Sequence, residues 1–253
     1  MTCLTDQAYN EGMNTLPHEK RCAIIRCLVD GCSIRATTRI TGGAKNTIQK
    51  LTRELGQAVL AYHDNVVRKV KSQRVQCDEV WCFCYAKDKN LPDEMRGQPG
   101  VGSMWTWTAI GADSKLMIGW RLGARDASHA YAFIRDVQER LANRIQLTTD
   151  GNRLYLDAVL DTFAQIDFAM LQKLYGPAAD SNEHTYSPPK CNGTKKKVVM
   201  GTPDPADIST SYAERENLNI RMQNRRFTRL TNAFSKRCLE PLGIGILRRP
   251  GLA

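Results

Sequence analysis

The order of strand-like and helix-like segments between residues 74 and 176 limits the possible folds more than any other feature of the chain. Segments rich in β-branched and aromatic residues span 74–86, 103–113 and 116–125. An amphipathic helix is expected over 126–145, followed by a short strand over 145–151, a helix over 152–164 and a strand over 166–176. This order predicts an α/β fold with a mixed β-sheet and helices on both faces, the arrangement of the ribonuclease H fold.

The segment before this core predicts three short helices within residues 17–56. Pro17 begins the first, Ser33 can cap the second, and Gly42 ends it. The third, "AKNTIQKLTREL", combines an apolar stripe with a polar, basic side formed by Lys45, Asn46, Gln49, Lys50 and Arg53. This pattern predicts a helix-turn-helix whose last helix contacts DNA bases and phosphates through those five side chains. An ordinary helical bundle with a solvated face is the alternative. Residues 56–73 predict a connecting helix.

The charge distribution favours a polyanionic partner. The net charge is +10 and the isoelectric point is about 9.2. Lys and Arg exceed Asp and Glu in the first 70 residues and again after residue 192, whereas the middle of the chain is balanced. A basic surface that only promotes solubility is the alternative. No apolar run is long enough for a membrane span, and an odd number of cysteines without a signal peptide suggests a cytoplasmic protein with reduced thiols.

Three carboxylates are candidates for a metal site. In a ribonuclease H fold the middle of the first strand lies beside the end of the fourth, which places Asp78 next to Asp150. A final helix predicted over about 210–234 can add Glu214, which shares a helical face with Arg221 and Arg225, whereas Glu216 points elsewhere. Glu79 is discounted because neighbouring strand residues face opposite sides. The alternatives are that the aspartates are turn or capping residues and that the final helix is a solvated face.

Carboxylates that converge from separate elements suit a hard cation. Mg²⁺ requires oxygen ligands, and two such ions about 4 Å apart can hold the attacking and leaving oxygens of a phosphodiester displacement. The residues therefore predict a metal-dependent phosphodiester chemistry at this edge of the sheet.

Several motifs also resemble a known family. "CDEVW", "TTDG" and "SYAERENLNIRMQNRRFTRLTNAFSK" resemble the three acidic blocks of transposases of the insertion sequence one family, which are DDE recombinases. "CSIRATTRITGGAKNTI" is similar to the helix-turn-helix of that family, and the resemblance covers residues 18–237. The resemblance implies that Asp78, Asp150 and Glu214 bind Mg²⁺, with Mn²⁺ as its substitute, and that Arg221 contacts the terminal DNA strand.

The same resemblance implies a function and a domain plan. The activity would be cleavage at the ends of an insertion sequence and joining of those ends to target DNA, by a homo-oligomer of at least two subunits at the bacterial nucleoid. Residues 1–70 would form the DNA-binding domain with its connecting helix. Residues 71–237 would form the catalytic domain, with an irregular insertion at 176–209. Residues 238–253 depart from the family pattern and resemble a truncated or frameshifted tail.

Two other functions remain open at this stage. A DNA-binding regulator or inactive remnant would keep the N-terminal helices without the chemistry. A nuclease or ribonuclease H-like protein would cleave other nucleic acids without joining them. DNA binding without cleavage would identify the first, and cleavage without strand joining would identify the second.

Overall fold

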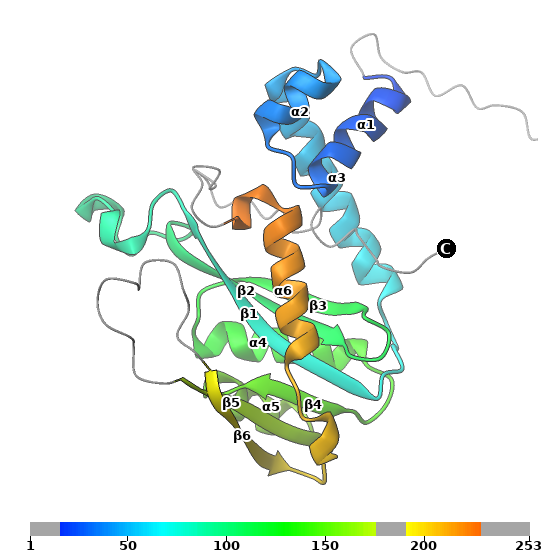
Figure 1. Cartoon of the computed structure of the whole chain (residues 1–253), viewed down its shortest axis with the longest axis vertical. Helices are drawn as coiled ribbons and strands as arrows, with labels where there is room; N and C mark the ends of the chain where they lie inside the picture. The colour runs from blue at the N-terminus through cyan, green and yellow to red at the C-terminus, as the bar shows by residue number, and fades with distance from the viewer. Residues whose placement is uncertain (1–15, 176–190, 229–253) are drawn as a thin grey trace, which may run out of the picture.

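Three N-terminal helices stand at one end of a six-stranded sheet that carries helices on both faces (Figure 1). The computed structural model describes residues 16–175 and 191–228. The predicted tail at 238–253, the last part of the predicted final helix and most of the first half of the predicted insertion therefore lie outside the described residues.

The N-terminal helices pack around a small apolar core of Ile24, Leu28 and Ile48. They are α1 (His18–Val29), α2 (Ile34–Thr41) and α3 (Lys45–Val66). The Oγ of Ser33 accepts a hydrogen bond from the backbone N–H of Ala36 at 3.1 Å, as an N-cap residue does. Gly42 ends α2 in the left-handed region, at a φ of 64°, which glycine adopts without the strain of a Cβ.

The predicted boundary between the third helix and a connecting helix is wrong, because α3 runs through Gly56 without a break. Gly56 is buried in the described structure. A single glycine inside a helix costs only about 1 kcal/mol, and the other residues of this long helix outweigh that cost. The helix ends at Val66, so residues 67–73 are not helical.

The sheet has the predicted ribonuclease H-like topology, with the strand order β3-β2-β1-β4-β5-β6. β1 is antiparallel to β2 and parallel to β4, and β5 is parallel to β4. The strands are β1 (Arg74–Cys84), β2 (Gly102–Gly111), β3 (Met117–Gly123), β4 (Gln146–Asp150), β5 (Asp167–Tyr175) and β6 (Cys191–Met200). The first five correspond to predicted strands.

β6 corrects the prediction that residues 176–209 are irregular. It pairs antiparallel with β5 and forms an edge of the sheet. Its sequence, "CNGTKKKVVM", opens with turn-forming residues and carries three exposed lysines, so it has no alternation of apolar and polar positions. An edge strand tolerates such a sequence, because lysines there discourage pairing with other chains.

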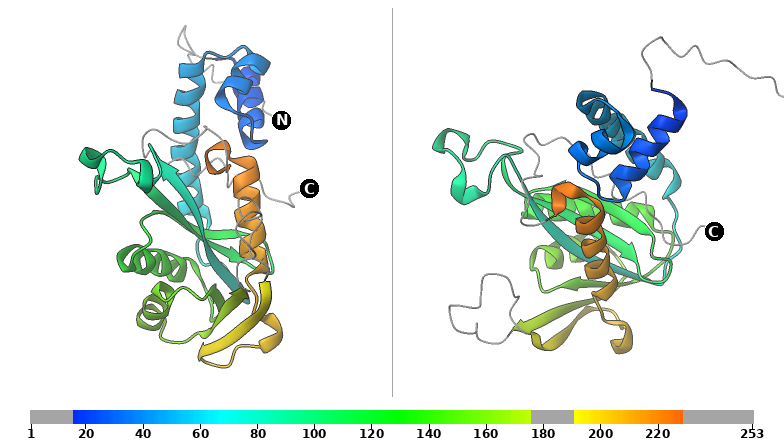
Figure 2. Two further views of the ribbon diagram at one scale, coloured as in Figure 1. Left: turned by 60° about the vertical axis from the view of Figure 1, so that its left-hand side comes forward. Right: turned by 45° about the horizontal axis from the view of Figure 1, so that its top comes forward.

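The helices form layers on both sides of the sheet (Figure 2). α4 (Ala127–Arg140) and α5 (Leu154–Thr162) pack on one face, where the main hydrophobic core includes Trp107, Phe133 and Tyr155. α6 (Ser211–Gln223) lies across the other face, where Ile220 packs with Val80 of β1. Each face therefore has its own apolar layer, as the predicted fold requires.

α6 is shorter than predicted. It ends at Gln223, and a 3₁₀ turn over Arg225–Phe227 follows. Asn224 has an extended backbone, and its side chain accepts a hydrogen bond from the N–H of Arg226 at 3.2 Å. This local bond competes with the continuation of the helix.

Arg140 joins α3 to the core. Its guanidinium is buried, forms an ion pair with Asp64 of α3 and bonds Asp136 of α4 at 2.8 Å. It also lies 3.2 Å from Nδ1 of His63, whose Nε2 is 3.0 Å from the carbonyl oxygen of Met117. The guanidinium can only donate, so His63 accepts at Nδ1 and donates from Nε2 to the carbonyl, which is the neutral imidazole.

Candidate active site

Asp78 and Asp150 meet where β1 extends beyond the end of β4. The parallel pairing between these strands stops at Cys77 and Thr149, and each of the two aspartates comes one residue later. Their carboxylates therefore lie at an open edge of the sheet instead of between two paired strands. The predicted meeting of these two side chains is found in the structure, where one oxygen of each lies within 4.8 Å of the other.

The third member of this acidic group is Glu79, which the sequence argument discounted. One carboxylate oxygen from each of Asp78, Glu79 and Asp150 lies within 4.8 Å of the others. Glu79 belongs to the opposite face of β1 from Asp78, as alternation predicts, and it lies over the α5 side of the sheet. The inference from alternation was wrong because β4 has ended at this point, so side chains from both faces can reach the same edge.

Glu79 is buried and held by polar partners from two loops. Nδ2 of Asn152 donates to its Oε1 at 2.8 Å, and Arg125 forms an ion pair with Oε2 at 3.4 Å. Arg125 also lies over the ring of Trp105 at 4.7 Å. Neither Asn152 nor Arg125 was identified from the sequence. Only the position of Asn152, two residues after Asp150 in the same turn, pointed to this edge.

The carboxylates disfavour one another's ionisation. Burial, followed by the charges of Asp150, Glu79 and Glu214, raises the pKa of Asp78 to about 7. Burial likewise raises the pKa values of Glu79 and Asp150, and the charge of Asp150 adds to the effect at Glu79. The charge of Arg125 offsets the raised pKa values of Glu79 and Asp150 only in part, and a bound cation would add further positive charge.

Glu214 is at the border of this cluster. It lies in the first turn of α6, and its charge contributes to the raised pKa of both Asp78 and Asp150. Within the described ranges it is not one of the three residues whose oxygens lie within 4.8 Å. Its carboxylate instead accepts from Nζ of Lys173 on β5 at 2.5 Å and from the hydroxyl of Thr210 at 2.6 Å.

The two arginines predicted to share a face with Glu214 have different positions. Arg221 is half-buried in the last turn of α6. Arg225 is exposed and lies in the 3₁₀ turn after the helix has ended. The expected common face of Glu214, Arg221 and Arg225 is therefore wrong for Arg225, because Asn224 stops the helical periodicity.

Two buried side chains next to the acidic group were also missed. Asn217 of α6 donates from Nδ2 to Oδ2 of Asp78 at 2.7 Å. Gln76 of β1 accepts from the backbone N–H groups of Tyr212 and Ala213, at 2.8 and 3.2 Å. Asn217 stands three positions after Glu214 in the "ERENLNIR" segment, and this helical spacing was the available signal.

The predicted DNA-contacting residues lie on the N-terminal half of α3. Lys45, Asn46, Gln49, Lys50 and Arg53 are all exposed, while Ile48 and Thr52 of the same helix are buried. Lys50 pairs loosely with Glu54 at 3.8 Å. The five side chains are therefore accessible to a partner from solvent.

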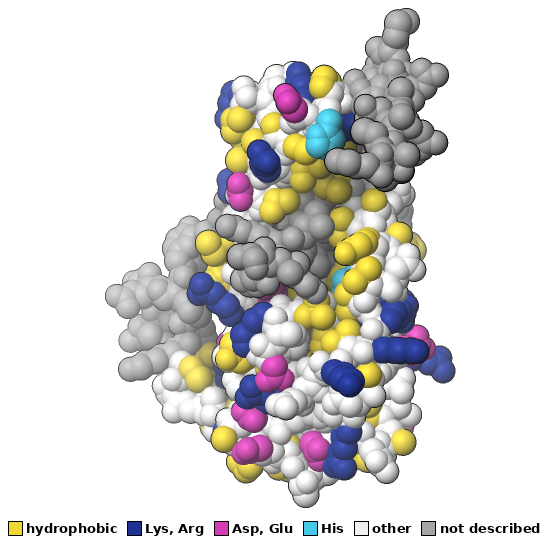
Figure 3. Space-filling model, turned by 90° about the vertical axis from the view of Figure 1, so that its right-hand side faces the viewer, with side chains coloured by type: hydrophobic (Ala, Val, Ile, Leu, Met, Phe, Trp, Pro, Cys, Tyr) yellow, Lys and Arg dark blue, Asp and Glu magenta, His cyan; other side chains and the backbone are white. Residues whose placement is uncertain are grey.

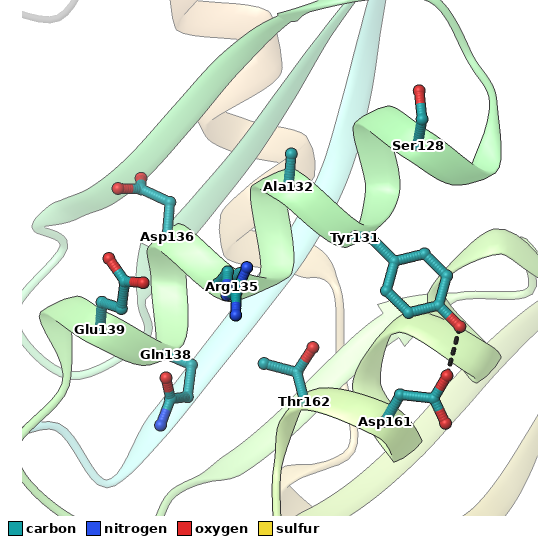
Figure 4. Close-up of a pocket in the computed structure, with 9 residues that line it drawn as sticks. All are labelled: Ser128, Tyr131, Ala132, Arg135, Asp136, Gln138, Glu139, Asp161 and Thr162. Carbon is teal, nitrogen blue, oxygen red and sulfur yellow. Dashed lines mark hydrogen bonds between the residues drawn. The ribbon is translucent and has the colours of Figure 1, made fainter.

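One cavity lies away from the acidic edge. This cavity of about 690 Å³ between α4 and α5 contains Tyr131 and Asp161, which are joined by a 2.5 Å hydrogen bond (Figure 4). It contains none of the predicted site residues.

On the face in Figure 3, Lys and Arg side chains are interspersed with Asp and Glu, so the basic charge does not form a single patch in this view. No helix in the described part of the chain combines the length and apolar character needed to cross a membrane.

The comparisons with known proteins give distant structural similarities. No protein-family model and no curated protein sequence matches the chain. A piggyBac transposase synaptic complex with hairpin DNA matches with a TM-score of 0.42 and 7% identity, over 96% of this chain and 67% of that one. The Mos1 strand transfer complex has a TM-score of 0.26 and 12% identity, over 63% of this chain and 60% of that one. A Mos1 mariner paired end complex with Mn has a TM-score of 0.24 and 10% identity, over 64% and 61%.

The chain spans about three fifths of the Mos1 chains that it matches. The described structure defines a class of protein with a ribonuclease H-like mixed sheet. An acidic group lies at the end of the two central strands, and three helices precede the sheet in the chain.

Proposed function

We propose that the chain is a transposase of an insertion sequence, similar to the insertion sequence one family, which cleaves element ends and joins them to target DNA. The observation that carries this proposal is the convergence of Asp78 and Asp150 at an open sheet edge of a ribonuclease H-like fold, with Glu214 on the adjacent helix. Hydrolysis at the element end would leave a 3′ hydroxyl, which would then displace a target phosphodiester.

The acidic edge fits Mg²⁺, with Mn²⁺ as a substitute. The group offers only carboxylate oxygens, which both ions prefer over nitrogen or sulfur. Asp78, Asp150 and Glu214 would hold the ions, and Glu79 is close enough to compete for them or support them. When bound, the metal would supply charge stabilisation for the attacking and leaving oxygens of the displacement.

Glu214 would join the site by giving up its bond to Lys173. Thr210 and Lys173 occupy its carboxylate oxygens in the described structure. The released Lys173 ammonium would lie beside the site, where it can attract a phosphate of the DNA. Arg221, about two turns further along α6, would contact the terminal DNA strand, and the exposed Arg225 would add a contact to the DNA backbone.

The N-terminal helices would bind the terminal repeats of the element through Lys45, Asn46, Gln49, Lys50 and Arg53 on α3. The supporting observation is that all five are exposed on a helix that lacks a side-chain N-cap, which leaves its first N–H groups open to a phosphate. Joining two ends requires a homo-oligomer, at least a dimer, on double-stranded DNA at the nucleoid in the cytoplasm.

The test is an assay of the purified chain on labelled duplexes taken from both flanks of its own gene, with Mg²⁺ and a circular target. The expected products are a nicked element end with a 3′ hydroxyl and a species in which that end is joined to the target. Cleavage without joining would indicate a nuclease instead.

A DNA-binding protein without chemistry is the second candidate. The observation in its favour is that Glu214 is engaged by Lys173 and Thr210 and lies outside the close acidic group among the described residues. Retardation of the same duplexes, with no cleavage in Mg²⁺ or Mn²⁺, would identify this function.

A further inference from the structure

The N-cap residue of α6 makes no side-chain capping bond, although Oγ of Ser209 accepts from the first helical N–H, that of Ser211, at 3.2 Å. Thr210 occupies the N-cap position, but its side chain makes no capping bond and instead donates to Glu214. The N–H groups that an N-cap side chain normally satisfies are those of the second and third helical residues, here Tyr212 and Ala213.

Gln76 supplies this cap from the sheet. Its Oε1 accepts from both Tyr212 N–H, at 2.8 Å, and Ala213 N–H, at 3.2 Å. Both partners are backbone donors, so the oxygen of the Gln76 amide must face them. The side chain is almost fully buried, at 3% exposure, so water cannot easily replace it.

A second polar contact follows along the same two elements. Asn217 is 5% exposed, and its Nδ2 donates to Oδ2 of Asp78. The hydroxyl of Thr108 on β2 lies 3.3 Å from Oδ1 of Asn217 and 3.0 Å from the carbonyl oxygen of Asp78. Asn217 therefore holds Oδ2 of Asp78, and the backbone N–H of Glu79 donates to the other oxygen, Oδ1, at 2.8 Å.

The contacts form a regular series. Gln76, Asp78 and Val80 are alternate residues of β1, about 7 Å apart, and face one side of the sheet. Their partners on α6 are Tyr212 and Ala213, then Asn217, then Ile220, in steps of about 5 to 7 Å. A shift of α6 by one residue would break both polar contacts. The series therefore defines where Glu214 stands relative to Asp78.

We infer that Gln76 and Asn217 are positioning residues, which fix the register of α6 on β1 and thereby deliver Glu214 to the Asp78 and Asp150 edge. Neither residue needs to touch DNA or metal for this role. The inference rests on the proposed function for the role of Glu214, whereas the cap itself is a property of the folded chain.

The first test replaces Gln76 in the full-length protein. Gln76→Met keeps the size of the side chain and removes the acceptor, and Gln76→Glu keeps an acceptor. Gln146→Met is the matched control, because Gln146 is also a strand glutamine that accepts a backbone N–H, that of Asp204 at 2.8 Å, away from α6. The readouts are hydrogen exchange of peptides covering 211–217 and the affinity for Mn²⁺ followed by its electron paramagnetic resonance signal.

Gln76→Met removes the acceptor that the Tyr212 and Ala213 N–H groups share, which predicts about tenfold faster exchange at these two residues. Its Mn²⁺ affinity should fall by a similar factor. Gln76→Glu should restore both, and Gln146→Met should change neither. The inference would be overturned if Gln76→Met exchanged at the rate of the parent protein. It would also be overturned if exchange became faster while the Mn²⁺ affinity stayed equal to that of the parent. Failure of the proposed function has a different signature, since the parent protein would then bind no Mn²⁺ while the exchange data still decide whether Gln76 caps α6.

The second test uses Asn217→Leu, with Asn219→Leu as its control on the same helix. Asn219 bonds only Glu216 in the described structure, at 3.0 Å. Asn217→Leu should lower Mn²⁺ affinity several-fold, and Asn219→Leu should leave it unchanged. Equal effects of the two variants would show that Asn217 has no special position.

Discussion

Asp78 is subject to two opposing influences. Its burial and its acidic neighbours favour the protonated form, whereas the bonds from Asn217 and from the backbone N–H of Glu79 favour the carboxylate. A residue with this balance responds strongly to a change of charge nearby.

The first prediction concerns the proposed metal ligands. Asp78→Asn, Asp150→Asn and Glu214→Gln should each reduce cleavage of an element end by at least about a thousandfold, since each removes a charged oxygen ligand. DNA binding should remain within about twofold of the parent. Asp161→Asn in the distant cavity is the control. Retained cleavage in any of the three variants would show that the residue is not a required ligand.

The second prediction is a pH dependence of stability. The pKa of Asp78 is about 7 in the folded protein and has an ordinary value of 3.8. Between these values the folded state binds more protons, so the metal-free protein loses stability as the pH rises towards 7. In the presence of a chelator, Asp78→Asn should have a higher melting temperature than the parent protein at pH 8. This difference in melting temperature should be smaller at pH 5.5. A gain that is independent of pH would contradict the shifted pKa.

At the scale of elements, the contact between β5 and α6 determines how Glu214 is presented. Lys173 of β5 holds Glu214, and both side chains are about one third exposed. The ammonium occupies the carboxylate that a metal would need. The two positive charges therefore compete for the same oxygens.

This competition leads to a third prediction. Lys173→Met should raise Mn²⁺ affinity about two- to tenfold, because it removes a cation beside the site. Lys195→Met on the neighbouring strand removes the same charge, but its partner in the sheet is Gln172, on the other face, so it should have little effect. Isothermal titration with Mn²⁺ measures both. A fall in affinity for Lys173→Met would show that Lys173 supports the site instead of competing with it.

Most of the strands and helices could be predicted from the sequence, but two features could not. Five strands and the helices on both faces were predictable, because each has a clear period and a cap or turn at its ends. β6 was not, since three lysines and a Gly-containing start hide an edge strand. The end of α6 was missed because Phe227 continues the apolar stripe and packs with Ile220 even though the helix has stopped.

The candidate site was predictable only in part for a related reason. Asp78 and Asp150 follow from the strand order. The place of Glu79, Asn152 and Lys173 at the site depends on where β4 ends and on which segments lie beside it. The pattern of residues in one sequence does not reveal the register between segments that are distant in the chain. Gln76 was hidden because a cap supplied by another element leaves no local signature.

At the scale of the whole molecule, the Arg140 cluster connects the N-terminal helices to the sheet. The guanidinium bonds α3 through Asp64 and α4 through Asp136, and it also bonds the carbonyl oxygen of Val67 at 3.3 Å. Burial and the Arg140 charge lower the pKa of His63, which keeps this imidazole neutral. The two halves of the molecule are therefore joined by a buried polar network.

The fourth prediction tests that junction. Arg140→Met should destabilise the protein by about 1–3 kcal/mol, because the buried His63 ring and the Val67 carbonyl lose their hydrogen-bond donor. Asp64 and Asp136 also lose their cation, but they are 47% and 29% exposed, so water can compensate them in part. Arg135→Met, at an exposed position of the same helix, should change stability by about 0.5 kcal/mol or less. Denaturant unfolding of both variants gives the comparison. An equal, small effect would show that the network does not hold α3 to the core.

The fifth prediction concerns the charge of the molecule as a whole. If DNA binding relies on lysines and arginines at phosphates, affinity for an element end should fall steeply as the salt concentration rises, by roughly a hundredfold or more between 50 and 200 mM. Fluorescence anisotropy at a series of salt concentrations measures the slope. An affinity that hardly changes with salt concentration would exclude binding through contacts to DNA phosphates.

The unbroken course of α3 has a geometric consequence for such a protein. Its 22 residues make a rod about 33 Å long. That length corresponds to about ten base pairs of duplex, one turn of B-DNA. If α3 binds DNA as proposed, with its first turns in a groove and its last turn anchored to the sheet, the length of this helix would set the number of nucleotides between the recognised bases and the cleaved bond.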